Sequence, residues 1–163
     1  MNVSREKPPR RSVRMSQVEM TQLVLPNDTN QLGNLLGGRL MEWMDIAAAI
    51  SAQRHGNRVC VTAAVDELVF HQPIRLGEVV TLRAFVNRVF GSSMEVGVQV
   101  LSENQLTGER KTANTAYLTF VAVDEKNNPV KVSPIIPRTR EEKRRYRDAL
   151  SRRVVRLKRR RKG

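Results

Sequence analysis

The pattern of apolar and polar positions predicts one strand, one long helix and a further strand in the first half of the chain. Polar and apolar residues roughly alternate over residues 15–25, as in a half-buried strand, and Pro26 stops that pattern. Residues 39–54 contain no Gly, Pro or Thr and are rich in Leu, Met and Ala, which favours a helix. Residues 59–70 are rich in β-branched side chains, which is typical of a strand.

Three more strands are predicted over residues 79–90, 94–103 and 110–123. The short link Gly91-Ser92-Ser93 joins the first two as a hairpin. Short links produce antiparallel neighbours, because parallel neighbours need a crossover of about a dozen residues or more. The sequence therefore predicts an α+β domain in which one helix packs against a curled antiparallel sheet.

The formal net charge of +13 is concentrated at the two ends of the chain. Residues 1–14 and 138–163 hold 19 of the 29 Lys and Arg residues but only four of the 16 Asp and Glu residues. The middle is thus faintly acidic, which excludes a nucleic-acid-binding core on the basis of overall charge. We expect a disordered basic arm at residues 1–14, a folded domain at residues 15–132 and a basic helical tail at residues 133–163.

The tail carries helix signals of its own. Thr139 and Glu142 have the spacing of a capping box, which starts a helix. We expect this helix to dock weakly through a thin apolar stripe, or to fold on a partner, and residues 15–137 to fold without it. The stripe consists of Tyr146, Leu150, Val154 and Leu157.

The composition excludes several kinds of site and segment. A single cysteine, Cys60, excludes an internal disulfide and a cysteine-built metal site, and only two histidines are present. We therefore expect neither a metal nor a cofactor, and a reducing compartment fits. No apolar run approaches the roughly 20 residues of a membrane span, and the N-terminus lacks the apolar segment of a signal peptide. A cytoplasmic location is predicted.

Asp45 lies on the predicted helix 39–54 among apolar neighbours. At about 100° per residue it falls between Met41 and Ala48 on one side and Ala49 on the other, with no basic side chain one turn away. A helix that is apolar nearly all round is expected to be buried, by the sheet or by a second subunit. A carboxylate there loses solvation, so Asp45 is a candidate functional residue. The alternative is a carboxylate at the helix rim that accepts a hydrogen bond from a backbone amide.

Two glycines and an asparagine precede that helix. Gly37 and Gly38 lie where it begins, and a helix start has free amides and a positive dipole end that can hold a developing oxyanion. Glycine also lets a ligand approach the backbone, although an ordinary tight turn would use the same pair. Asn30 supplies a neutral amide that can orient a water or a carbonyl, and its alternative reading is a turn asparagine.

Six blocks of residues follow one another in a recognisable order along the chain. They are Asp28-Thr29-Asn30-x-x-Gly33-x-x-x-Gly37-Gly38, Leu40-Met41-x-Trp43-Met44-Asp45, Thr62-Ala63-x-Val65-Asp66, Phe70-x-x-Pro73-Ile74-x-x-Gly77-Glu78, Gly91-Ser92-Ser93-Met94-Glu95-Val96 and Tyr117-x-Thr119-Phe120-Val121-Ala122. Together these blocks resemble the acyl-CoA thioesterases of the hotdog fold, the group that contains the YciA-type and animal cytosolic acyl-CoA hydrolases. The resemblance spans about residues 15–132, leaves both basic ends uncovered and is specific because the blocks occur in order.

This resemblance implies a five-stranded antiparallel sheet wrapped around the long helix, a homodimer with active sites at the subunit interface, and a trimer of dimers. It implies that Asp45 is the catalytic acidic residue, acting as general base or nucleophile, and that Asn30 reaches it from the other subunit as an orienting group. The Gly38 amide would donate to the oxyanion and Gly37 would contact the substrate. Many members carry His or Phe where this chain has Leu36. CoA is then part of the substrate, and no cofactor is needed.

The phosphates of CoA require cations or hydroxyl donors. Arg54, Arg58 and Arg88 lie near predicted loop or strand ends, and Ser92 and Ser93 lie in the hairpin link. Each of the five could equally be a solvated surface residue.

Two rival functions follow from other features. Asp66 and His71 have the spacing of a hotdog enoyl hydratase pair, but an odd separation places them on opposite faces of a continuous strand, and the usual Asn-Pro is missing between them. The second rival is a dimeric binding protein whose arginine-rich tail contacts nucleic acid or an anionic membrane. Because Tyr146 is the only aromatic residue in that tail, such contacts would be to phosphate and not to stacked bases.

Overall fold

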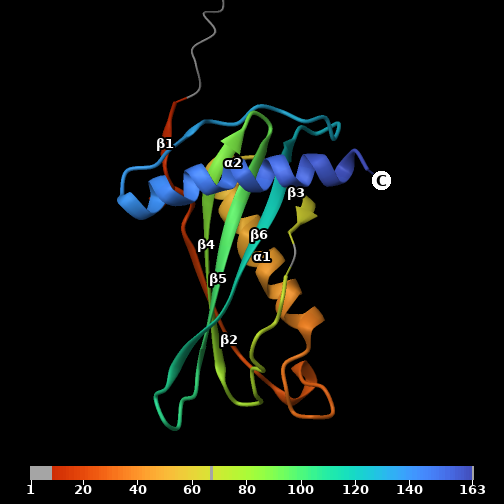
Figure 1. Ribbon diagram of the computed structural model, residues 1–163, viewed down its shortest axis with the longest axis vertical. Coiled ribbons are helices and arrows are strands. Elements are labelled where there is room, and N and C mark those ends of the chain that lie inside the picture. The colour runs from red at the N-terminus through yellow and green to blue at the C-terminus, as the bar shows by residue number, and fades with distance from the viewer. Residues whose placement is uncertain (1–8, 67, 163) are drawn as a thin grey trace, which may run out of the picture.

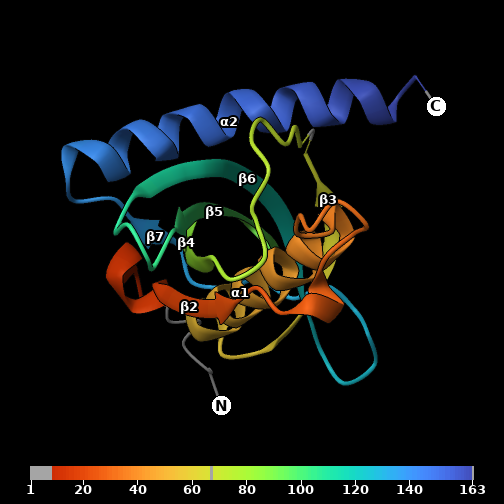
Figure 2. The same cartoon turned by 90° about the horizontal axis from the view of Figure 1, so that it is seen from below.

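A five-stranded antiparallel sheet curls around one long helix (Figures 1 and 2). The computed structural model describes residues 9–66 and 68–162. The strand order is β2-β4-β5-β6-β3, and the predicted α+β fold class is confirmed. The elements are β2 (Val18–Leu23), α1 (Gly37–Gly56), β3 (Val59–Val65), β4 (Val79–Phe90), β5 (Ser93–Glu103) and β6 (Arg110–Val123).

The core lies between α1 and the concave face of the sheet. Every second residue of β4, β5 and β6 is buried there, as Leu82, Val98 and Phe120 illustrate, because side chains alternate between the two faces of a strand. Met44 and Ala48 of α1 pack into the same cluster. Each large side chain removed from water in this way contributes about 1.5–3 kcal/mol, so one face of α1 is firmly fixed against the sheet.

Helix α1 is longer than the predicted span of residues 39–54. It begins at Gly37 and ends at Gly56, so both glycines of the predicted turn form its first turn. Asn57 ends the helix in the left-handed conformation, with φ of 50°. Helix propensity disfavours Gly, and this is why the prediction stopped short at both ends.

Two predicted strands are shorter in the structure than in the sequence analysis. The strand predicted at residues 15–25 forms only β2, because residues 13–16 form a 3-10 helix in which the buried Ser16 hydroxyl donates to the Val13 carbonyl, at 2.7 Å. That hydroxyl also accepts from the Val86 amide of β4, at 3.0 Å. The strand predicted at residues 59–70 ends at Val65, and residue 67 lies outside the described residues.

The predicted N-terminal arm is partly folded. Residues 1–8 lie outside the described residues. Residues 11–12 form β1 (Arg11–Ser12), which pairs in parallel with β7 (Ile135–Ile136). The Arg11 guanidinium donates to the His55 carbonyl at the end of α1, at 2.6 Å, and Val13 is buried. Residues 11–14 are therefore ordered, because backbone pairing and a buried valine fix them.

The tail forms helix α2 (Arg140–Arg160), which lies across the outer face of the sheet (Figure 2). The capping box is confirmed, because the Thr139 hydroxyl accepts from the Glu142 amide, at 3.1 Å. The predicted docking stripe is wrong for three of its four residues: Tyr146 packs against the core, but Leu150, Val154 and Leu157 are exposed, and Ala149 is buried instead.

Arginine side chains make most of the contact between α2 and the sheet, where an apolar stripe was predicted. The Arg145 guanidinium lies 4.0 Å from the centre of the Phe85 ring, and that of Arg153 lies 4.4 Å from the centre of the Phe90 ring. Guanidinium groups bind aromatic faces while their methylene stems cover apolar surface. A helix with few apolar residues can thus dock on a sheet face that presents rings. Among the described residues, no helix combines the length and the apolar character needed to cross a membrane.

We predict that cutting the chain after Arg138 destabilises the protein, contrary to the sequence-based expectation for residues 15–137. The cut exposes Phe85 and Phe90 and removes the charges that neutralise the buried Glu95. Losing several kcal/mol should lower the thermal unfolding midpoint by roughly 10 °C or more. A cut after Arg160 removes only three residues and is the control. Equal midpoints for the two truncated forms, measured by circular dichroism, would contradict a structural role for α2.

Candidate active site

Asp45 lies half-buried on α1 and has one side-chain partner. The hydroxyl of Thr62 on β3 donates to Asp45 Oδ1, at 2.7 Å. The alternative considered from the sequence was a carboxylate at the helix rim that accepts from a backbone amide. In the structure the donor is a side-chain hydroxyl instead. A hydroxyl donor fixes the orientation of the carboxylate, which suits a base or a nucleophile. Sequence reasoning missed Thr62 as a functional residue, although it opens one of the family-like blocks.

A cavity of about 350 Å³ surrounds this pair. Its walls are mainly apolar and come from the start of α1, from β3 and β6, and from the segment after β3. An apolar wall beside one carboxylate can hold an acyl chain next to a reactive group. The lining residues are Gly38, Met41, Glu42, Met44, Asp45, Thr62, Val65, Leu68, Ala116 and Leu118.

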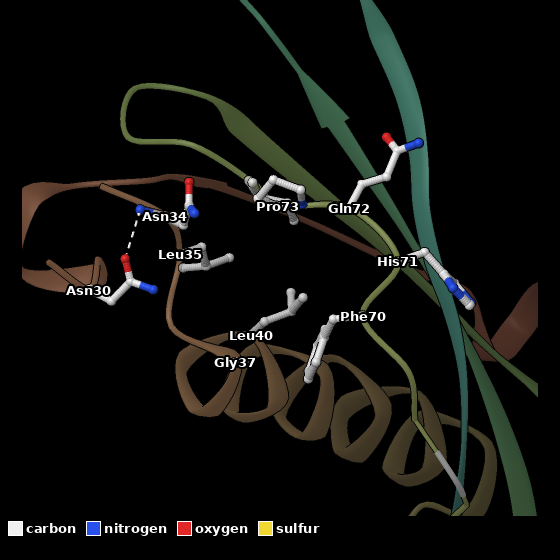
Figure 3. Close-up of a pocket in the computed structure, with 10 residues that line it drawn as sticks. Asn30, Asn34, Leu35, Gly37, Leu40, Phe70, His71, Gln72 and Pro73 are labelled. Atoms are coloured by element: carbon white, nitrogen blue, oxygen red, sulfur yellow. Dashed lines mark hydrogen bonds between the residues drawn. The ribbon is translucent and has the colours of Figure 1, made fainter. Parts of the chain in front are cut away.

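Asn30 lines a second cavity, of about 300 Å³, beside the start of α1 (Figure 3). Its side-chain oxygen accepts from the amides of Leu32, at 2.9 Å, and Asn34, at 3.1 Å. This is the turn geometry foreseen as the alternative reading of Asn30. The same bonds orient the side chain so that its amide nitrogen points toward the cavity (Figure 3). Asn30 is therefore both a turn residue and a fixed donor.

The two glycines stand between the cavities. Gly37 lines the Asn30 cavity and Gly38 lines the Asp45 cavity. The helix starts after Leu36 without a side-chain cap, so the amides of its first turn can bind a ligand. A Cβ at Gly37 would lie 3.2 Å from the Phe70 ring, whereas a Cβ at Gly38 would meet nothing within 4 Å. Within one chain Asn30 and Asp45 therefore line different cavities.

The five residues predicted to bind the CoA phosphates line neither of these cavities. Arg54 donates to the carbonyl of Gln17, at 2.8 Å, and Arg58 is exposed. Arg88 donates to the carbonyl of Tyr146, at 3.2 Å, and its guanidinium lies 4.1 Å from the centre of that ring. Arg88 of β4 therefore helps to hold α2 on the sheet.

The hairpin serines lie at the same end of the sheet. Ser93 accepts from Arg153 of α2, at 3.1 Å, so it also contributes to α2 docking. The Ser92 carbonyl accepts from the Ala122 amide, at 2.9 Å, which is a sheet contact. A single chain therefore does not bring these residues to the Asp45 cavity.

The hydratase pair is not formed. Asp66 is bonded to Arg156 of α2, at 2.8 Å, whereas His71 lines the Asn30 cavity. Burial raises the pKa of Asp66, and the neighbouring Arg156 opposes that rise. Burial also raises the pKa of Cys60 to about 11, so this thiol is no nucleophile. The described residues contain no group of three or more His, Cys, Asp or Glu side chains that could hold a metal ion.

Comparison with known proteins identifies the family. The thioesterase superfamily matches residues 32–109, from the loop before α1 to the start of β6. The chain is 45% identical over 137 residues to the acyl-CoA thioester hydrolase YkhA of Bacillus subtilis and covers 80% of it. It belongs to the hotdog-fold acyl-CoA thioesterase family. It is also 45% identical to acyl-coenzyme A thioesterase 11 of Mus musculus, but it spans only 24% of that longer protein.

Solved structures of this thioesterase family agree with the fold. An acyl-CoA hydrolase from Bacillus cereus is 40% identical to this chain and has a TM-score of 0.91. The match covers 94% of this chain and 94% of the hydrolase. An acyl-CoA hydrolase from Staphylococcus aureus, solved with butyryl-CoA and CoA, is 37% identical with a TM-score of 0.85 and covers 94% of this chain and 93% of its own. That hydrolase has also been solved as separate alanine variants of an aspartate, a threonine and an asparagine.

The glycines at the start of α1 form a matched pair for a stability prediction. Gly38→Ala should leave the protein as stable as the wild type or up to about 1 kcal/mol more stable, because alanine favours a helix and the added methyl meets no atom. Gly37→Ala should be less stable than Gly38→Ala, because its methyl displaces the Phe70 ring. Chemical denaturation of both variants measures the difference, and a Gly37→Ala protein at least as stable as Gly38→Ala would contradict the close packing.

Proposed function

We propose that this thioesterase-family chain hydrolyses acyl-CoA thioesters to a free carboxylic acid and CoA. The observation that carries the proposal is Asp45, held by the Thr62 hydroxyl and facing an apolar cavity whose rim is formed by Gly38 at the start of α1. In this proposal Asp45 is the base or nucleophile, the Gly38 amide is the donor for an oxyanion, and the cavity gives room for an acyl chain beside them. Thioester hydrolysis needs no more, because the thiolate is a good leaving group.

As a general base, Asp45 takes a proton from a water while the water oxygen attacks the thioester carbonyl. The Gly38 amide at the positive end of α1 donates to the oxyanion that forms. Collapse of that intermediate breaks the carbon–sulfur bond, and the thiolate of CoA leaves and takes up a proton. As a nucleophile, Asp45 would instead form an anhydride with the acyl group, which water then hydrolyses. The Thr62 hydroxyl orients the carboxylate in either route.

Asn30 is proposed to act from a second subunit. Support comes from the separate cavities of Asn30 and Asp45 within one chain, and from exposed apolar side chains on α1 and on the edge strand β3. Covering that apolar surface would favour a homodimer. An acyl-CoA thioesterase that is 42% identical and a thioesterase of Yersinia pestis have both been solved as hexamers, which fits a trimer of dimers. The exposed residues are Met41, Ile46, Val59, Val61 and Val65.

Sequence spacing adds support for these roles. The asparagine, aspartate and threonine replaced in the Staphylococcus aureus hydrolase have the same separations along the chain as Asn30, Asp45 and Thr62. We propose that these three residues serve the same reaction here. Arg54, Arg58, Arg88, Ser92 and Ser93 stay proposed contacts for the phosphates of CoA bound across subunits. Contact of α2 with nucleic acid or an anionic membrane stays a prediction.

Asp45→Asn should lose thioesterase activity while keeping its fold and assembly, because the substitution removes the charge and keeps the shape. We expect kcat on acetyl-CoA, butyryl-CoA or palmitoyl-CoA to fall at least about 100-fold, measured by the release of free thiol. Glu125→Gln removes a charge far from the cavity and is the control. Near-normal kcat in Asp45→Asn, with the wild type active, would rule out the assignment.

The composite site predicts that two inactive variants complement each other. If Asn30 and Asp45 of one site come from different subunits, a mixed dimer of Asn30→Ala and Asp45→Ala chains has one intact site and one doubly altered site. Random exchange makes about half of the dimers mixed, so activity should recover to about a quarter of wild type.

Co-refolding the two chains, with mixed dimers counted by native mass spectrometry, tests this. Failure to recover activity in confirmed mixed dimers would mean that both residues serve a site within one subunit, or that one of them is not catalytic.

A further inference from the structure

Helix α2 is docked through a carboxylate that is completely buried. Glu95 of β5 is 0% exposed and points to the outer face of the sheet. Arg152 donates to both of its oxygens, at 2.7 Å through Nη2 and 3.0 Å through Nε, and the Asn87 amide donates at 2.9 Å. A buried charge is tolerated only when it is paired and hydrogen-bonded in this way. Gly97 leaves the space for Asn87, since a Cβ there would lie 2.9 Å from the Asn87 amide nitrogen.

Arg156 extends this network to the end of β3. Its Nη1 atom lies 2.8 Å from Asp66 Oδ2 and 3.3 Å from Glu95 Oε2. The backbone amide of Asp66 donates to the Tyr117 carbonyl of β6, at 3.0 Å, and the Arg152 guanidinium lies 3.7 Å from the centre of the Tyr117 ring. The Arg156 and Asp66 side chains are only 17% and 18% exposed. Their ion pair is therefore screened from solvent far more than an ordinary surface pair.

Asp66 lies just before a segment that lines both cavities. Residues 68–74, here called the wall segment, contribute Leu68 to the Asp45 cavity and Phe70 to Ile74 to the Asn30 cavity. Figure 3 shows the Phe70 side chain beside the start of α1. At the other side of Asp66, β3 carries Thr62, the partner of Asp45. Asp66 thus lies between the hydroxyl that orients the candidate base and the wall that shapes both cavities.

Among the described residues, few hydrogen bonds hold the wall segment in place. It is irregular, so it lacks the ladder of hydrogen bonds that fixes a strand. The Val69 carbonyl accepts from the Asn114 side chain, at 2.6 Å, and the Ile74 carbonyl accepts from the Leu35 amide, at 2.7 Å. At its start, the segment is anchored by the Asp66 ion pair with Arg156 and by the bond from the Asp66 amide to the Tyr117 carbonyl.

We propose that Arg156 of α2 is a positioning residue for the active site: by holding Asp66 it fixes the wall segment, and with it the shape of both cavities. Helix α2 is then part of the active-site scaffold, although it lies on the opposite face of the sheet. The functional side of this inference rests on the proposed thioesterase activity, while the mechanical side rests on the Glu95, Arg156 and Asp66 contacts alone.

Arg156→Gln tests the proposal. Arg147→Gln is the matched control, because it removes the same charge from an exposed position on the same helix. For Arg156→Gln we expect KM for butyryl-CoA to rise about tenfold while kcat changes less than about twofold, because a displaced wall weakens substrate binding more than it alters the base. Amide hydrogen exchange in residues 68–74 should quicken about tenfold without substrate. Arg156→Lys keeps a cation and should restore part of both effects.

Asp66→Asn breaks the same pair from the other side, so it serves if Arg156→Gln does not fold, and it should show the same rise in KM and exchange. A lower unfolding midpoint with KM and exchange equal to those of Arg147→Gln would overturn the proposal and leave only a structural ion pair. If the wild type hydrolyses no acyl-CoA, the proposed function fails. Exchange in residues 68–74 then still decides whether Arg156 holds the wall segment.

Discussion

The burial of one face of α1 in the curled sheet places Asp45 and the glycines of the candidate active site. Leu40, Met44, Ala48 and Ala52 recur at helical spacing and pack against the inner side chains of the sheet. Their burial fixes the rotation of α1 about its axis, so Asp45 can face only β3 and its Thr62 hydroxyl. The same packing brings the uncapped start of the helix to the mouth of the cavity. A different rotation of α1 would separate the carboxylate from both its hydroxyl partner and the Gly38 amide.

The outer face of the sheet has the opposite chemistry. It presents aromatic rings and the carboxylate of Glu95, which a purely apolar helix could not neutralise. The arginines of α2 satisfy both, because a guanidinium stacks on a ring and donates several hydrogen bonds in one plane. Contacts within the chain therefore explain part of the basic composition of the tail, namely Arg145, Arg152, Arg153 and Arg156. One consequence is that the two faces are linked: the helix on the outer face reaches Asp66, which borders the cavities on the inner side.

The strands were predicted most accurately where two patterns agreed. β4 and β6 have the predicted bounds because alternating burial and turn residues mark the same ends. Predictions were less accurate where a side chain binds the backbone, as Ser16 does before β2, and where the strand pattern of residues 59–70 continued past the end of β3 at Val65. The bond between Ser16 and Val86 joins residues far apart in sequence, so no window of residues could have shown it.

The sequence by itself determined the fold class, the helix that carries Asp45 and the family, because apolar periodicity and ordered motifs are properties of neighbouring residues. It also placed Gly37 and Gly38 at the start of that helix and Asn30 in the loop before it. Only the tertiary structure decided that Thr62 is the partner of Asp45, that arginines supply most of the contact between α2 and the sheet, and that Asn30 and Asp45 line separate cavities. Those outcomes depend on contacts between residues far apart in the chain, whose geometry is set by packing and not by spacing.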